Sequence, residues 1–253
     1  MNGKYAVLVA AEDGLIREVL NGFYRKEALG PSSLAIFRLF GRIGNSWRSV
    51  HVMLQGSKGA YELESCANDC AAILRCMLDA SLQIAYILVQ PEEAEERGQL
   101  YLDYEHVERY QMVKDVLPLD NPIVKRLRES ARRAEAEPRV RAEYERVKGK
   151  YTHGKGSIRS QWYPGNLRQL AKAVGKEEEY LLFVKQFSSA IHSGPMATRY
   201  GASASTRRAI DATAGKIVAQ TAAMLVAHEA LFISERSAAI LEATPSEISA
   251  SVS

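Results

Sequence analysis

The stretch that most constrains the fold is residues 65–89, whose apolar residues follow helical spacing around most of a cylinder. One face carries apolar or small residues at steps of three and four: Ala67, Cys70, Ile73, Leu74, Met77, Leu78, Ser81, Ala85 and Leu88. Other apolar residues, among them Cys76, Ile84 and Ile87, lie on the remaining sides. Neighbouring helices must therefore cover most of this helix, which makes it the centre of an all-α protein.

Two charged residues, Arg75 and Asp79, stand in the middle of this apolar stretch. A charge in a largely covered helix is costly unless an opposite charge accompanies it. A spacing of four residues places the two side chains on one face, where they can pair. We therefore expect Arg75 and Asp79 to be coupled.

The length of 253 residues is compatible with one large domain or two small ones, and the core is ample, because 47% of the residues are hydrophobic. The net charge of +3 is too small to indicate nucleic-acid binding by itself. All three cysteines lie on the central helix without a CxxC motif, which predicts reduced, buried thiols and no metal site. No signal peptide is evident at the N-terminus. We expect a cytoplasmic protein with no cofactor and no membrane partner.

The same periodicity predicts further helices over residues 4–27, 32–55, 92–117, 166–174, 177–192 and 205–242. Gly41 and Gly44 interrupt the second of these and should let another helix approach closely. We predict a single helical-bundle-like domain of about seven or eight helices over residues 1–245, followed by a polar tail over 246–253.

Residues 121–150 are the most charged part of the chain, with ten lysines and arginines against five glutamates. Pro138 should divide this segment into two helices or kink one. We expect the whole charged excursion, residues 121–165, to pack outside the core. It is either a solvated face or a binding surface.

The loop over residues 151–165 interleaves aromatic with basic residues, a mixture that can stack on and hold a nucleic acid. On this interpretation the nucleic-acid contacts are Lys148, Lys150, Lys155, Arg159 and Trp162. The alternative, which is more common for such loops, is that the Trp162 side chain is buried in the core as a plug.

Common catalytic signatures are missing: the sequence has no phosphate-binding loop, HExxH or GxSxG. The remaining candidate is His192, which follows Ser188 and Ser189 at the end of an apolar helix. A helix C-terminus favours the protonated imidazole, so His192 is either functional or a capping residue.

Three segments, ILRCMLDASLQIAYI, PEEAEERGQLYLDYEHVERY and YLLFVKQFSSAIHSGP, resemble a bacterial domain-of-unknown-function family, number 5677. The resemblance covers about residues 30–200. That family carries an arginine and an acid on its central helix, an acid- and tyrosine-rich helix after it, and a late S-x-x-x-H. The matching residues here are Arg75, Asp79, Asp103, Tyr104, Ser188 and His192, with Asp79 where a glutamate is expected. The resemblance implies the fold but no activity.

A second resemblance is to HEPN domains, helical bundles of which many are metal-independent ribonucleases. Lys185, Gln186 and His192 match their motif, with lysine in place of its arginine. Two functions follow. The first is a binding or interaction module with a polar pocket lined by Arg75, Asp79, Tyr104 and His192. The alternative is a ribonuclease or nucleic-acid-associated defence or stress protein, with His192, Arg75 and Lys185 catalytic and RNA or a nucleotide as partner. A homodimer is compatible with either.

Overall fold

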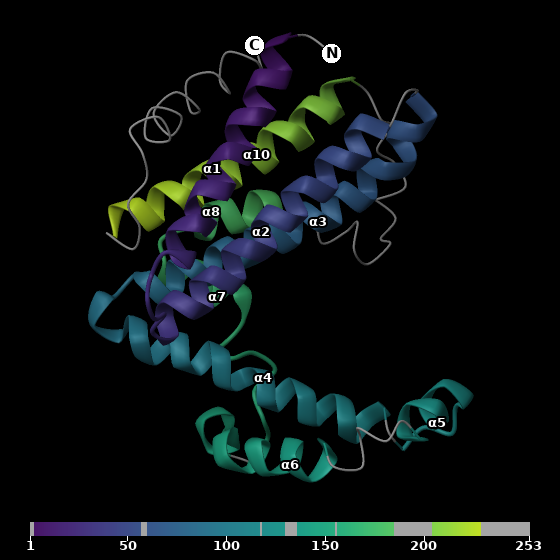
Figure 1. Cartoon of the computed structure of the whole chain (residues 1–253), viewed down its shortest axis with the longest axis vertical. Helices are drawn as coiled ribbons and strands as arrows, with labels where there is room; N and C mark the ends of the chain where they lie inside the picture. Colours follow the sequence, from purple (N-terminus) through teal and green to yellow (C-terminus); the bar gives the residue numbers. More distant parts are fainter. Residues whose placement is uncertain are drawn as a thin grey trace.

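The computed structural model describes residues 3–56, 60–116, 118–129, 136–154, 156–184 and 204–228 (Figure 1). Within these ranges every regular element is helical, and the only strand-like pairing is an isolated bridge between Thr152 and Ile158. The predicted all-α class is therefore confirmed. The long helices are α1 (Gly3–Tyr24), α2 (Pro31–Gly56), α3 (Ala60–Leu88), α4 (Ala94–Val116) and α10 (Ala204–Ala227). The shorter ones are α5 (Pro122–Glu129), α6 (Ala136–Val147), α7 (Leu167–Ala173) and α8 (Glu177–Glu179).

Short turns complete the path between these helices. A 3-10 turn over Pro91–Glu93 leads into α4, and another over Lys148–Tyr151 follows α6. Asn166 caps α7 with a capping box: its side chain accepts from the Gln169 amide, while the Gln169 side chain accepts from the Asn166 amide. Beyond α8 the chain continues as a π-helical turn over Tyr180–Val184. The remainder of the helix expected over residues 177–192 lies outside the described residues.

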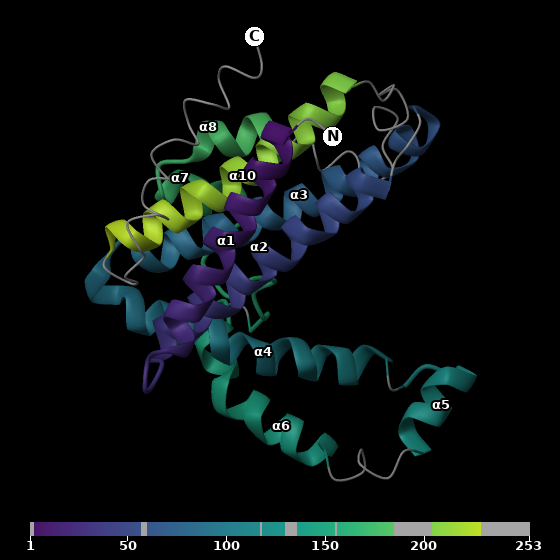
Figure 2. The same ribbon diagram turned by 45° about the horizontal axis from the view of Figure 1, so that its top comes forward.

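The core is built around α3, as its apolar surface predicts. Helices α2, α10 and α7 pack against it, and α1 packs against α2 and α10. Helix α2 carries an apolar stripe that is buried throughout: Ile36, Phe40, Ile43, Trp47, Val50 and Leu54. Both views show α1, α2, α3 and α10 gathered into one bundle (Figure 2). Residues Asp69–Leu88 of α3 are long and apolar enough to span a membrane by composition alone, but in this structure they form the centre of the bundle.

Helix α4 packs against α2 at its start and then extends out of the bundle, so that α5 and α6 lie outside the bundle as well (Figures 1 and 2). The charged excursion therefore divides in two. In its first part, α6 packs beside α4, α5 follows the far end of α4, and both helices lie outside the bundle. Its second part returns, because Tyr151, Trp162 and Tyr163 are buried members of the core. Pro138 lies in the first turn of α6, where its missing amide hydrogen costs no helical hydrogen bond.

The two glycines of α2 have different surroundings. At Gly44 a Cβ atom would come 2.7 Å from the Ile16 side chain, so this glycine lets α1 approach α2 as predicted. At Gly41 a Cβ atom would meet nothing within 4 Å. Gly41 instead lies in the groove described below.

Candidate functional site

The candidate site begins at Arg42, an exposed residue of α2 that faces both α3 and α4. Its guanidinium group interacts electrostatically with Asp79 of α3 and with Tyr101 and Glu108 of α4. Within the described ranges no hydrogen bond or ion pair holds it. Arg42 thus carries a positive charge at the meeting point of three helices without being committed to one acid. We call Arg42, Arg75, Asp79, Gln83, Tyr101 and Glu108 the polar junction.

The α3 side of the polar junction is the predicted pair. Asp79 is half-buried, and desolvation raises the pKa of its carboxyl group. Arg75, the Gln83 side chain and Arg42 oppose that shift, in this order of strength. The Gln83 amide donates to Asp79 Oδ1 at 3.4 Å. Arg75 and Asp79 are therefore coupled, but Asp79 is less deeply buried than the apolar helix around it suggests.

On the α4 side, desolvation raises the pKa of both Tyr101 and Glu108. Glu105 raises the pKa of Glu108 further, while Arg42 lowers it. Several titratable groups with shifted pKa values at one helix junction are a common property of functional sites. Tyr101 packs against the hydrophobic core, whereas Glu108 is exposed on α4.

The loop after α6 closes the junction with aromatic rings. Trp162 is only 3% exposed, and its Nε1 donates to Gln83 Oε1 at 2.7 Å. Its ring contacts Tyr86, Tyr101 and Tyr163, with centroids 5.5–5.6 Å apart. Of the two alternatives for Trp162, the core plug is thus the one that its position fits. Through Gln83, this plug also positions Asp79.

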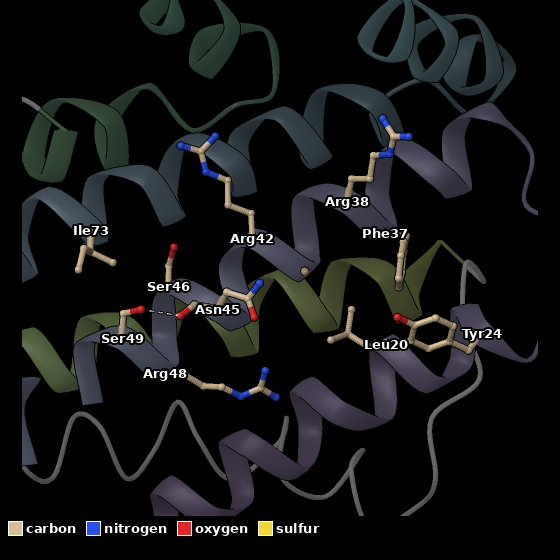
Figure 3. Close-up of a pocket in the computed structure, with 11 residues that line it drawn as sticks. Leu20, Tyr24, Phe37, Arg38, Arg42, Asn45, Ser46, Arg48, Ser49 and Ile73 are labelled. Atoms are coloured by element: carbon tan, nitrogen blue, oxygen red, sulfur yellow. Dashed lines mark hydrogen bonds between the residues drawn. The ribbon is translucent and has the colours of Figure 1, made fainter. Parts of the chain in front are cut away.

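A groove with a volume of about 700 Å³ crosses the exposed face of α2 (Figure 3). We call it the α2 groove, and its polar lining is Arg38, Arg42, Asn45, Ser46, Arg48 and Ser49. Leu20 and Tyr24 of α1, Phe37 of α2 and Ile73 of α3 supply apolar surface. Because Arg42 belongs to both features, the α2 groove and the polar junction form one continuous site.

The other arginines of the α2 groove are paired at the surface. Arg38 donates to Glu105 of α4 at 2.9 Å, and Arg48 donates to Asp13 of α1 at 3.2 Å. The two arginine side chains are 47% and 42% exposed, so each pair is weak. A competing anion can displace such partners at little cost.

A second titratable cluster lies between α1, α2 and α10. Glu12 Oε2 accepts from Trp47 Nε1 at 2.8 Å, and His51 lies between Glu12, at 3.6 Å, and Asp211, at 3.2 Å. Neither imidazole nitrogen makes a well-aligned hydrogen bond within the described residues. Burial raises the pKa of Glu12 to about 7 and lowers that of His51. The side chains of Glu12 and His51 are 5% and 4% exposed, so we assign this cluster to stability and not to ligand binding.

The remaining predicted pocket residues are distributed unevenly. Tyr104 is buried near the junction, and its hydroxyl donates to the Arg159 carbonyl at 2.8 Å. Asp103 instead faces α6 and the 3-10 turn after it: it accepts from Lys150 at 2.6 Å and lies 3.6 Å from Arg146. These contacts hold the pKa of Asp103 below its ordinary value, against the opposing effect of burial. The structure therefore brings Arg75, Asp79 and Tyr104 to one region but not Asp103.

The basic residues proposed as nucleic-acid contacts are largely engaged within the chain. Lys148 pairs with Glu145, and Lys150 pairs with Asp103. Arg159 donates to the Lys150 carbonyl and lies over the Tyr151 ring. The other site residues predicted from sequence, Lys155, Lys185, Ser188 and His192, lie outside the described residues, and their roles stay predictions.

Sequence reasoning missed the α2 face of the site, although a signal was present. Arg38, Arg42, Asn45 and Ser49 recur at three- and four-residue steps opposite the buried stripe of α2. The chemistry that this arrangement offers is charge and hydrogen bonding. Within the part of the chain that the structure describes, no group of three histidine, cysteine or acidic side chains could hold a metal ion.

The fold and the site together define an all-helical protein with a polar, arginine-lined site beside its central helix. Residues 33–206 match a family described as a family of unknown function, DUF5677. The match covers more than half of the chain, and the chain belongs to this family. No curated protein and no solved structure matches the chain. The resemblance to HEPN domains therefore stays a prediction.

Proposed function

We propose that this chain is a binding module that holds an anionic ligand where the α2 groove meets the polar junction. The observation that carries the proposal is Arg42: it is exposed, it lies in both features, and it makes no ion pair within the described ranges. An arginine held near acids but not paired with any of them can donate several hydrogen bonds to a ligand.

The surroundings of Arg42 suit an anion. Asn45 and Ser46 line the groove within one helical turn of it and supply neutral hydrogen-bonding groups. On the other side, Arg42 interacts electrostatically with the half-buried Asp79, whose carboxylate is shared with Arg75, so Asp79 does not neutralise Arg42 alone. The volume of the groove also lies in the range of small-molecule sites.

Pyrophosphate is a suitable first probe, because it presents closely spaced negative charges without a base or a sugar. The thermal midpoint of the wild-type chain should rise with pyrophosphate concentration, as it does for any ligand that binds only the folded state. Arg42→Gln should weaken binding by about 10- to 100-fold, the effect of losing one charged hydrogen bond.

The matched control is Arg168→Gln, which removes an exposed arginine of α7 that forms one ion pair, with Glu177. This variant should respond to pyrophosphate as the wild type does. If the wild type gains no stability, or if Arg42→Gln gains as much as the wild type, the proposal is wrong.

A further inference from the structure

We infer that the anionic ligand of the α2 groove is a single-stranded nucleic acid, whose phosphates contact Arg38, Arg42 and Arg48 and one of whose bases stacks on Tyr24. This inference rests on the proposed function and names the chemical class of its ligand. It places the nucleic-acid contacts on α2 and not on residues 148–162.

The spacing of the arginines points to a chain of phosphates. Arg38 and Arg48 are ten residues apart on one helix, which corresponds to about 15 Å along its axis. Figure 3 shows Arg38 and Arg42 extending to one side of α2 and Arg48 to the other. A single phosphate group cannot contact all three guanidinium groups, whereas the successive phosphates of a nucleic acid can.

The two acids that pair with arginines of the α2 groove, Asp13 and Glu105, each have a second arginine partner. Asp13 pairs with Arg48 and also with Arg17, at 2.5 Å. Glu105 pairs with Arg38 and also with Arg109. If a phosphate displaces Asp13 from Arg48, Asp13 therefore still pairs with Arg17, and if a phosphate displaces Glu105 from Arg38, Glu105 still pairs with Arg109. Binding a phosphate chain leaves neither acid unpaired, so the usual penalty for breaking an ion pair is avoided.

An aromatic ring stands at the end of the same groove. Tyr24 is 74% exposed, which is unusual for a large aromatic side chain. Its ring is held edge-on against Phe37, with centroids 5.1 Å apart. An open aromatic ring beside a basic groove is how proteins stack unpaired bases. A duplex keeps its bases stacked inside, so this ring favours a single strand.

The α2 groove offers few groups that could read a base sequence. Apart from the arginines, its polar side chains are Asn45, Ser46 and Ser49, and the Ser49 hydroxyl already donates to the Asn45 carbonyl at 3.0 Å. Contacts from arginine to phosphate and from an aromatic ring to a base carry little sequence information. We therefore expect binding with weak sequence preference.

Fluorescence anisotropy with a labelled twelve-nucleotide oligothymidylate tests the inference. Affinity should fall with salt, with a log–log slope of about −0.7 for each phosphate contact. Arg38→Gln, Arg42→Gln and Arg48→Gln should each lower the affinity and make the slope shallower by about 0.7. Tyr24→Ala should lower the affinity by about 5- to 150-fold and leave the slope unchanged, because stacking releases no counterion. Tyr24→Phe, which keeps the ring, should bind as the wild type does.

Two controls locate the site. Arg168→Gln should have no effect, and Lys148→Gln tests the surface suggested by sequence alone. If Lys148→Gln weakens binding while the groove variants do not, the inference is overturned. It is also overturned if a duplex of the same length binds as tightly, or if Tyr24→Ala binds as the wild type does.

Comparison with pyrophosphate separates this inference from the proposed function. If pyrophosphate binds through Arg42 but the oligonucleotide does not bind at low salt, the nucleic-acid inference fails and the anion site remains. If neither binds, both fail.

Discussion

Replacing Glu12 with glutamine should remove a loss of stability that the wild-type protein undergoes as the pH rises towards 7. Glu12 is 4% exposed, lies between α1, α2 and α10, and accepts a hydrogen bond from Trp47. Burial is the main reason that its pKa rises from 4.5 to about 7, and the hydrogen bond from Trp47 only partly offsets it. The folded state therefore holds a proton on Glu12 at pH values where the unfolded chain has lost it.

The sign and size of the effect follow from this difference. The stabilising contribution of protonated Glu12 is complete below pH 4.5 and is lost as the pH rises through about 7. Each pKa unit corresponds to about 1.4 kcal/mol, so the loss amounts to roughly 3 kcal/mol. Glutamine resembles the protonated acid and keeps an oxygen for Trp47. Glu12→Gln should thus be more stable than the wild type by no more than about 1 kcal/mol at pH 5 and by about 3 kcal/mol at pH 8.

Urea denaturation between pH 5 and pH 9 measures this difference. Burial lowers the pKa of His51, so both proteins should lose stability as the pH falls below 6.5. Subtracting one curve from the other removes the pH dependence that both proteins share. Glu27→Gln, at an exposed position, should show no such trend. A stability difference between wild type and Glu12→Gln that does not change with pH would refute the reasoning.

Three further predictions concern the same helices and the sequence-based alternative. Gly215→Ala should destabilise the folded protein by about 1–3 kcal/mol, because the added Cβ atom would overlap the Glu12 carboxylate. At Gly14 an added Cβ atom would meet nothing within 4 Å, so Gly14→Ala should be neutral or stabilising in the same denaturation assay. Asp79→Ala should lower the free energy of unfolding by about 2 kcal/mol, whereas Asp120→Ala, at an exposed position, should change it almost not at all. Replacing Arg75 and Asp79 together by apolar residues should recover part of the loss. Equal denaturation midpoints for the two single variants would show that Asp79 is not coupled to Arg75. The ribonuclease alternative predicts that wild type but not His192→Ala cuts RNA in the presence of a chelator; no cleavage, or equal cleavage by both, removes it.

The helices and the core were predictable because they depend on local periodicity. The stripe of α2, the central position of α3 and the Asn166 cap all follow from residues a few positions apart. The core position of Trp162 was the more frequent of the two alternatives for its loop, whereas the burial of Tyr163 beside it was not predicted, since the charged residues around both resemble a solvated loop.

The site was only partly predictable, because it depends on contacts between distant segments. Arg75 and Asp79 are four residues apart, and their coupling was visible in the sequence. The link from Asp79 to Arg42 and Glu108 joins three helices, and no pattern along the chain encodes it. Asp103 shows the converse: it has the residue type expected at a pocket, but it pairs with Lys150, 47 positions away, in the 3-10 turn after α6.

The position of a bound anion tests the central claim most directly. A crystal structure of the chain grown with pyrophosphate should show phosphate oxygens within hydrogen-bonding distance of the Arg42 guanidinium, in the groove between Tyr24 and Asn45. A pyrophosphate bound instead at Lys148 and Lys150, with no density beside Arg42, would contradict the account.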